Sequence, residues 1–201
     1  MSSSIPTTVR NEVISEVYRR ADDLDWPALT DQERSSLYDA WVKDPDIGGK
    51  LVGHIPASRM RVWLKDGPLK EFTRARWGLG PLAHLVSRRY PGPQELVQRI
   101  LGTDWSVLNA SIKIKPNRCT ASNFTKRTTF LWGLSSSFDS MVTCALHAIA
   151  DGQPDPLITV TIEQGRPVPK DEKAVQKKIA ARIGVPLHHT TVRLRPVTPA
   201  L

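Results

Sequence analysis

The sequence of 201 residues predicts an α/β or α+β fold, in which a mixed sheet of about five strands carries helices on at least one face. Two patterns indicate it: apolar residues recur at helical spacing in several segments, and other segments alternate like half-buried strands. The composition, 40% hydrophobic and 24% charged, is that of a globular chain. We therefore expect one domain over residues 1–201, with an acidic helical segment (1–50) before a basic α/β core (51–201).

The N-terminal segment is predicted to be helical. Four aliphatic residues with helical spacing indicate a first helix: Val9, Val13, Ile14 and Val17. Thr30 and Glu33 then have the spacing of a capping box, which opens a second helix that ends before Pro45.

The next segment predicts a short strand followed by a helix. Alternating residues indicate the strand: Arg61, Trp63 and Lys65 on one side, Val62 and Leu64 on the other. A turn at 66–68 precedes a helix over 69–77, and one side of this helix carries Lys70, Arg74 and Trp77. Two further short helices are expected at 82–89 and 94–101.

The remaining chain predicts most of the sheet. The clearest strand runs over 105–115, with two alternating faces: Leu108, Ala110, Ile112 and Ile114 on one, and Trp105, Asn109, Ser111, Lys113 and Lys115 on the other. A second strand is expected over 128–133, and a helix follows. Its apolar stripe consists of Phe138, Met141, Val142, Ala145, Leu146 and Ile149. The segment 157–195 has the pattern of a parallel strand–helix–strand crossover.

The positive charge is unevenly distributed. The formal net charge is +8, but residues 1–50 hold 6 Lys and Arg against 10 Asp and Glu. Residues 51–130 hold 14 against 4, and residues 131–201 hold 8 against 6. A segment with an excess of ten positive charges favours an anionic partner at one surface.

Nucleic acid is the partner that this region favours, although the sequence does not distinguish DNA from RNA. Lys and Arg neutralise phosphates, and exposed tryptophans stack on bases. We expect Trp63 and Trp105 to be exposed beside these cations. The candidate binding residues are Arg61, Trp63, Lys65, Lys70, Arg74, Trp77, Trp105, Lys113, Lys115, Arg118, Lys126 and Arg127.

A metal-dependent nuclease is an alternative hypothesis. Asp104 lies nine residues before Lys113, and the segment NASIKIK around Lys113 is loosely similar to the PD-(D/E)xK nuclease arrangement. The resemblance covers about a dozen residues, and Ser111 stands where the second carboxylate belongs. Asp66 and Glu71 are the other candidate ligands. Under this hypothesis Mg²⁺ is the cofactor; otherwise we expect no cofactor and no metal.

The other alternative is a subunit or adaptor protein that binds a protein partner, or a second copy of itself, through its charged surfaces. The sequence has no stretch of about 18 apolar residues, so we expect no membrane partner. Its first residues lack the pattern of a secretory signal, and its two cysteines are too few for a disulfide framework. These observations predict a cytoplasmic protein, and they leave open whether it is an enzyme.

Overall fold

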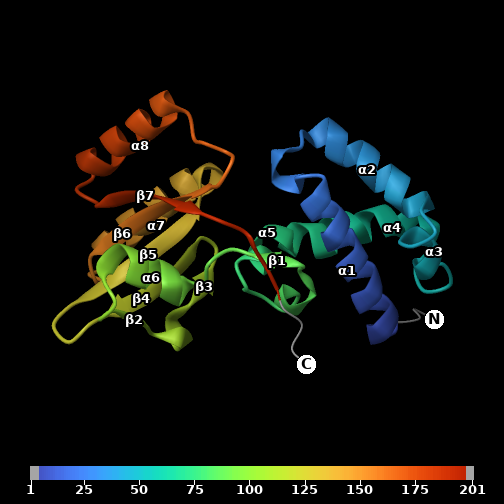
Figure 1. Cartoon of the computed structure of the whole chain (residues 1–201), viewed down its shortest axis with the longest axis horizontal. Helices are drawn as coiled ribbons and strands as arrows, with labels where there is room; N and C mark the ends of the chain where they lie inside the picture. Colours follow the sequence, from blue (N-terminus) through green and yellow to red (C-terminus); the bar gives the residue numbers. More distant parts are fainter. Residues whose placement is uncertain (1–4, 198–201) are drawn as a thin grey trace. The chain divides into compact units, whose positions relative to one another are not determined.

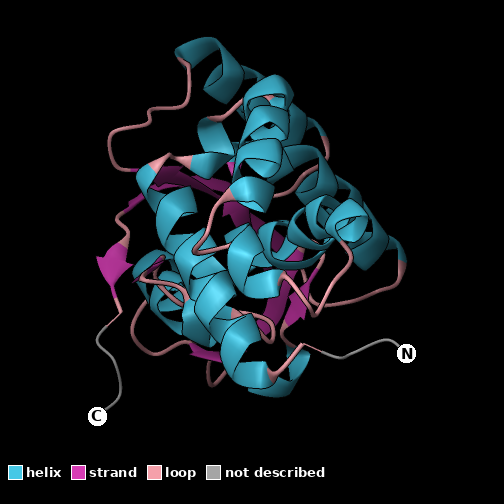
Figure 2. Cartoon of the chain, turned by 90° about the vertical axis from the view of Figure 1, so that its right-hand side faces the viewer, coloured by secondary structure: helices cyan, strands magenta, loops and turns pink. Residues whose placement is uncertain are grey.

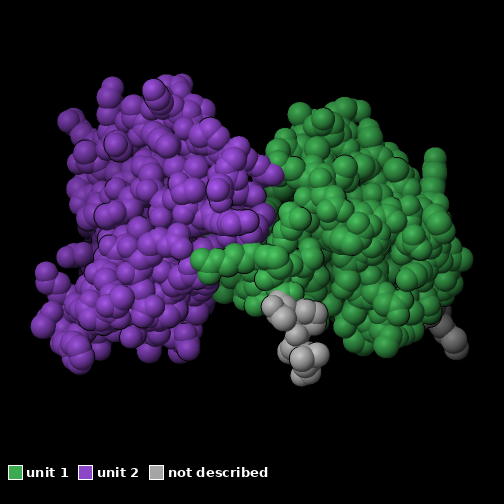
Figure 3. Space-filling model, in the orientation of Figure 1, with its two compact units in different colours: residues 1–89, 195–201 green, residues 90–194 purple. Residues whose placement is uncertain are grey.

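The computed structural model describes residues 5–197, and the chain divides into two compact units (Figure 3). Unit 1 comprises residues 1–89 and 195–201, and unit 2 comprises residues 90–194. Unit 2 is therefore inserted in the chain of unit 1. The fold is α+β with a mixed sheet and an N-terminal helix, as the sequence predicts.

Unit 1 is mainly helical; helices are drawn in cyan in Figure 2. Its helices are α1 (Thr7–Asp23), α2 (Asp31–Lys43), α3 (Gly48–Leu51), α4 (Ala57–Leu64) and α5 (Lys70–Arg76), with 3-10 turns η1 (Trp26–Ala28) and η3 (Ala83–Leu85) and a π-helical turn η2 (Lys65–Leu69). Large aromatic side chains fill the core of unit 1. The ring centroids of Tyr18 and Phe72 are 5.1 Å apart, and the Trp26 ring stacks on the Trp41 ring. Strands β1 (Arg88–Arg89) and β8 (Arg195–Pro196) form an antiparallel ribbon.

The predicted strand over 61–65 is wrong, because this segment belongs to α4 and η2. Met60 and Leu64, one helical turn apart, are buried, whereas Val62 is 56% exposed. A strand would have placed Val62 and Leu64 on the same face, so the burial follows the helical period. The chain then continues through Pro68 as a π-helical turn. The carbonyl oxygen of Pro68 accepts a hydrogen bond from the Tyr18 hydroxyl at 2.9 Å, so the irregular turn is tied to the core.

Unit 2 contains the sheet (Figure 1). Its elements are α6 (Pro93–Leu101), β2 (Ser106–Val107), η4 (Asn109–Ser111), β3 (Lys113–Ile114), β4 (Asn117–Ser122), β5 (Arg127–Leu134), η5 (Ser135–Ser137), α7 (Phe138–Ala150), β6 (Pro156–Glu163), α8 (Lys170–Arg182) and β7 (Leu187–Val192). Among the described residues the sheet has six strands in the order β2-β4-β5-β6-β7, and β3 also pairs with β4. Strand β4 is antiparallel to its neighbours, and β5, β6 and β7 are parallel.

Helices α7 and α8 pack on one face of the parallel strands, as the predicted crossover requires. Phe138, Met141 and Ala145 of α7 are buried against this face. The predicted stripe is wrong at its far end, because Leu146 and Ile149 are 46% and 48% exposed. The buried side of the last turns passes through Ala148 instead, so the packed face is narrower than the apolar pattern.

The predicted strand over 105–115 is also interrupted. Strands β2 and β3 flank the 3-10 turn η4, so the two alternating faces do not persist. The Ser111 hydroxyl donates to the carbonyl oxygen of Leu108 at 2.6 Å, and it accepts the backbone N–H of Thr120 at 2.7 Å. A serine side chain that bonds the local backbone in this way replaces part of the strand ladder.

Within residues 5–197, no helix combines the length and the apolar character needed to cross a membrane.

Candidate nucleic-acid interface

The twelve predicted binding residues are divided equally between the two units. Unit 1 carries Arg61, Trp63, Lys65, Lys70, Arg74 and Trp77, and unit 2 carries Trp105, Lys113, Lys115, Arg118, Lys126 and Arg127. The residues that the sequence groups in one basic zone therefore belong to two compact units.

In unit 1, both candidate arginines, Arg61 and Arg74, make contacts within the fold. The guanidinium of Arg61 lies 2.8 Å from the carboxylate of Asp39, donates to the Ser35 hydroxyl at 2.7 Å and lies over the Tyr38 ring. Arg74 forms an ion pair with Glu71 one helical turn away. These arginines already have anionic partners, so their charge is largely neutralised within unit 1.

The tryptophans of unit 1 are not exposed stacking surfaces. Trp77 is 2% exposed, and Trp63, which the strand pattern predicted to be exposed, is partly buried against the core of unit 1. Lys65 and Lys70 are exposed. Unit 1 therefore offers two of its six predicted residues as free surface cations.

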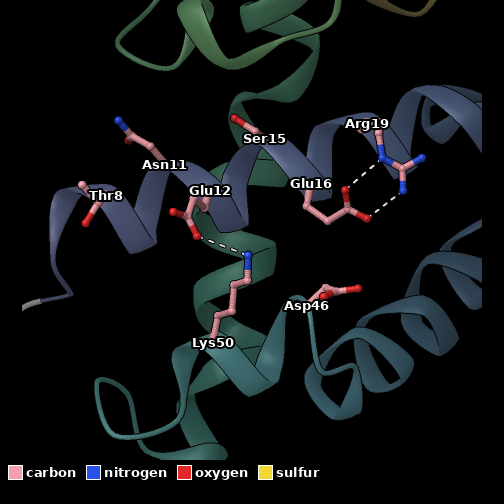
Figure 4. Close-up of a pocket in the computed structure, with 8 residues that line it drawn as sticks. All are labelled: Thr8, Asn11, Glu12, Ser15, Glu16, Arg19, Asp46 and Lys50. Atoms are coloured by element: carbon pink, nitrogen blue, oxygen red, sulfur yellow. Dashed lines mark hydrogen bonds and ion pairs between the residues drawn. The ribbon is translucent and has the colours of Figure 1, made fainter.

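The acidic residues of the first 50 positions mostly pair with cations of the same unit. Three of them, Glu12, Glu16 and Asp46, line a surface cleft of about 810 Å³ between α1 and the start of α3 (Figure 4). The other lining residues are Thr8, Asn11, Ser15, Arg19 and Lys50. Glu12 pairs with Lys50 at 3.2 Å, and Glu16 pairs with Arg19 at 2.7 Å. The hydrogen bond from Arg19 lowers the pKa of Glu16 to about 2 against the opposing effect of burial. The cleft is lined by ion pairs that are already formed.

In unit 2, strand register brings three cations to one face of the sheet. Lys113 lies opposite Arg118 across the β3–β4 pair, and Ser122 lies opposite Arg127 across the β4–β5 pair. Cross-strand partners share a face, and so do alternate residues of one strand. The residues that share this face, which we call the basic face, are Lys113, Arg118, Thr120, Ser122 and Arg127.

The basic face lies beside the helix-covered part of the sheet. Arg118 is opposite Leu131, which is buried under α7, so the basic face and α7 are on the same side. The alternate residues Cys119 and Ala121 point to the other side and are buried. Four residues of strand separate Arg118 from Ser122, a distance of roughly 13 Å. The basic face is thus a row of cations and hydroxyls along the outer strands.

The cations of this region lack carboxylate partners. In the described part of the chain, no salt bridge involves any of Lys113, Lys115, Arg118, Lys126 and Arg127. Arg118 donates instead to the carbonyl oxygens of Lys115 and Pro116 at 3.1 and 3.3 Å, which orients its guanidinium without neutralising it. The candidate arginines of unit 1 have carboxylate partners, whereas these cations of unit 2 have none among residues 5–197.

The exposed aromatic residue of this region differs from the predicted one. Trp105, expected beside the lysines, is 9% exposed, and its carbonyl accepts a hydrogen bond from Gln94 at 3.0 Å. Phe124, in the turn between β4 and β5, is 98% exposed. The sequence carried a signal for it, since Phe124 stands alone among polar residues and belongs to no apolar stripe.

Within unit 2, the candidate nuclease residues Asp104 and Lys113 do not lie at one site. Asp104 accepts a hydrogen bond from Asn123, just beyond one end of β4, while Lys113 pairs with Arg118 near the other end. Five residues of extended chain separate these two positions, roughly 16 Å. Asp66 and Glu71 belong to unit 1, and Glu71 is paired with Arg74.

Among the described residues, no group of three or more His, Cys, Asp or Glu side chains is arranged to hold a metal ion. Burial raises the pKa of the Cys119 thiol to about 12, which keeps it protonated and unreactive. Cys144 is also unpaired by any disulfide.

No protein-family model, no curated protein and no solved structure matches this chain.

Proposed function

We propose that the chain binds nucleic acid in the cytoplasm through the basic face of unit 2. One observation carries the proposal: Lys113, Arg118 and Arg127 share a face of the sheet, and no carboxylate pairs with them. Such cations release condensed counterions from a phosphate backbone, which is the main source of sequence-independent affinity.

The spacing of the basic face suits a row of phosphates. The roughly 13 Å from Arg118 to Ser122 is long enough for the basic face to contact more than one phosphate of a strand. Thr120 and Ser122 lie between the cations, and their hydroxyls are of the kind that donate to phosphate oxygens. Exposed Lys115 and Lys126 extend the positive potential at either end.

A double variant tests the proposal. Lys113→Ala with Arg127→Ala removes two exposed cations from the basic face, and we expect it to weaken binding of a fluorescein-labelled 20-nucleotide oligomer by roughly tenfold at 100 mM salt. The measurement is fluorescence anisotropy. The matched control is Lys177→Ala with Lys178→Ala, which removes the same charge from the exposed side of α8.

The control variant should bind within about twofold of the unaltered protein. Equal losses in the two variants would show that only net charge matters. No binding by the unaltered protein to DNA or RNA oligomers would contradict the proposal outright.

A further inference from the structure

The most exposed large apolar side chain of the described residues is Phe124, at 98% exposure. The other three phenylalanines, Phe72, Phe130 and Phe138, are at most 4% exposed. Phe124 therefore makes no contribution to either core. A fully exposed aromatic ring is the type of side chain that proteins present to a partner.

Hydrogen bonds fix the turn that presents this ring. The Asn123 side-chain oxygen accepts the backbone N–H groups of Thr125 and Lys126, at 3.1 and 2.8 Å. The Asn123 backbone N–H donates to the Lys126 carbonyl at 3.0 Å, and its side-chain amide donates to Asp104 at 3.1 Å. The turn is thus closed on both sides of Phe124, which limits the entropy lost when the ring is immobilised by a ligand.

The residues that follow the ring are cationic. Lys126 and Arg127 are both exposed, and Arg127 is part of the basic face. A ligand that uses both the ring and the cations combines a flat apolar surface with negative charge. A nucleotide has both, in its base and its phosphate.

We propose that Phe124 stacks on an unpaired base of a nucleic acid whose phosphates lie along the basic face, an inference that rests on the proposed function. Stacking on an aromatic side chain requires a base with a free face, which single strands offer and the interior of a duplex does not. The site therefore prefers single-stranded nucleic acid.

A membrane surface fits the turn less well. Segments that bind a lipid interface present several apolar side chains together, whereas Asn123 and Thr125, which flank Phe124, are polar and bonded within the turn. The charge complementarity of the basic face with phosphates favours nucleic acid.

The test compares single and double strands in the full chain. Phe124→Ala should weaken binding to a 15-nucleotide oligothymidylate by roughly tenfold and change binding to the matching duplex by less than about twofold. Phe124→Trp should retain the single-strand affinity. The control is Val52→Ala, which trims an apolar residue of unit 1 that is 68% exposed. Melting temperatures should not change, because the Phe124 ring is outside both cores.

The outcomes separate the two proposals. Unchanged single-strand affinity in Phe124→Ala, together with a loss in Lys113→Ala/Arg127→Ala, would overturn the stacking inference and leave the proposed function standing. Equal losses on single strand and duplex would also overturn it. Failure of the unaltered chain to bind any oligomer would overturn both. Sedimentation with phosphatidylserine vesicles that depends on Phe124, without any effect of Phe124 on oligomer binding, would assign the turn to a membrane.

Discussion

His189 is held by a chain of hydrogen bonds whose directions can be assigned. The Gln176 amide nitrogen donates to the Ser135 hydroxyl at 2.6 Å, so the Gln176 oxygen must accept from Nε2 of His189, at 2.7 Å. Ser135 in turn donates to Glu172. Neutral His189 therefore carries its proton on Nε2, under α8.

Stability should depend on the protonation of this histidine. Burial lowers the pKa of His189 below its usual value, and the neighbouring charges of Lys173 and Lys177 add to the effect. The unfolded chain therefore takes up the proton first as the pH falls below about 6.5, and folding stability decreases through that range. Urea unfolding at pH 7.5 and 5.5 should show this loss, and His189→Gln should reduce it.

The control for this prediction is Val175→Ala, at an exposed position of α8 that carries no titratable group, which should leave the pH dependence unchanged. A pH dependence in His189→Gln identical to that of the unaltered chain would refute the assignment.

The partner of a charged residue can be predicted from the sequence only when the two residues are close in the chain. Glu71 and Arg74 are three apart, and a pair between them is a natural sequence-based expectation. Arg61 instead meets Asp39, 22 residues away, because α2 and α4 pack together. Which cations remain free for a ligand is decided by such long-range contacts, so composition alone overestimates the binding surface in unit 1.

Helix α2 shows a local signal that suffices to place an element. Thr30 accepts the backbone N–H of Glu33 at 3.3 Å, and Glu33 accepts the backbone N–H of Thr30 at 2.7 Å, which confirms the predicted capping box. Thr30→Ala should lower the free energy of unfolding by about 1 kcal/mol in chemical denaturation. Thr8→Ala, at an exposed position in α1 without a capping bond, should change it by less than about 0.5 kcal/mol. Equal effects of the two substitutions would contradict the capping role.

Elements were predictable where local pattern and packing agree. The α7 helix and the β6–α8–β7 crossover follow their periodicity, because each buries one face on a neighbour. The strand predicted over 61–65 and the uninterrupted strand predicted over 105–115 are wrong. The alternation over 61–65 was too short to distinguish a strand from a helix. Over 105–115 the Ser111 hydroxyl bonds the Leu108 carbonyl and the Thr120 N–H, which replaces part of the strand ladder.

The arrangement of the whole chain suggests that unit 1 folds without unit 2. Arg89 and Arg195 are partners in the β1–β8 ribbon, so the chain leaves and re-enters unit 1 at adjacent positions. The core of unit 1 is built from its own residues, between Val13 and Val86. Replacing residues 90–194 by Asn-Gly should close a hairpin between Arg89 and Arg195.

The shortened chain should be helical by circular dichroism and unfold cooperatively in urea. A shortened chain without cooperative unfolding would instead support the single domain over 1–201 that length and composition predict.

The distribution of charge over the molecule concentrates the binding hypothesis in unit 2. The acidic residues of the first 50 positions largely pair with arginines and lysines of unit 1, while five cations around β3, β4 and β5 have no anionic partner. Of the twelve candidate binding residues, these five cations and the exposed Lys65 and Lys70 of unit 1 are the ones left to contact a ligand by charge.

The most direct test of nucleic-acid binding is its salt dependence. Five phosphate contacts on a single strand predict a slope of log K against log[salt] of about −3.5, or roughly a hundredfold loss of affinity between 50 and 200 mM salt. Lys113→Ala/Arg127→Ala should make the slope shallower by about 1.4. A nearly flat plot for the unaltered protein, or an unchanged slope in the double variant, would contradict binding through the basic face.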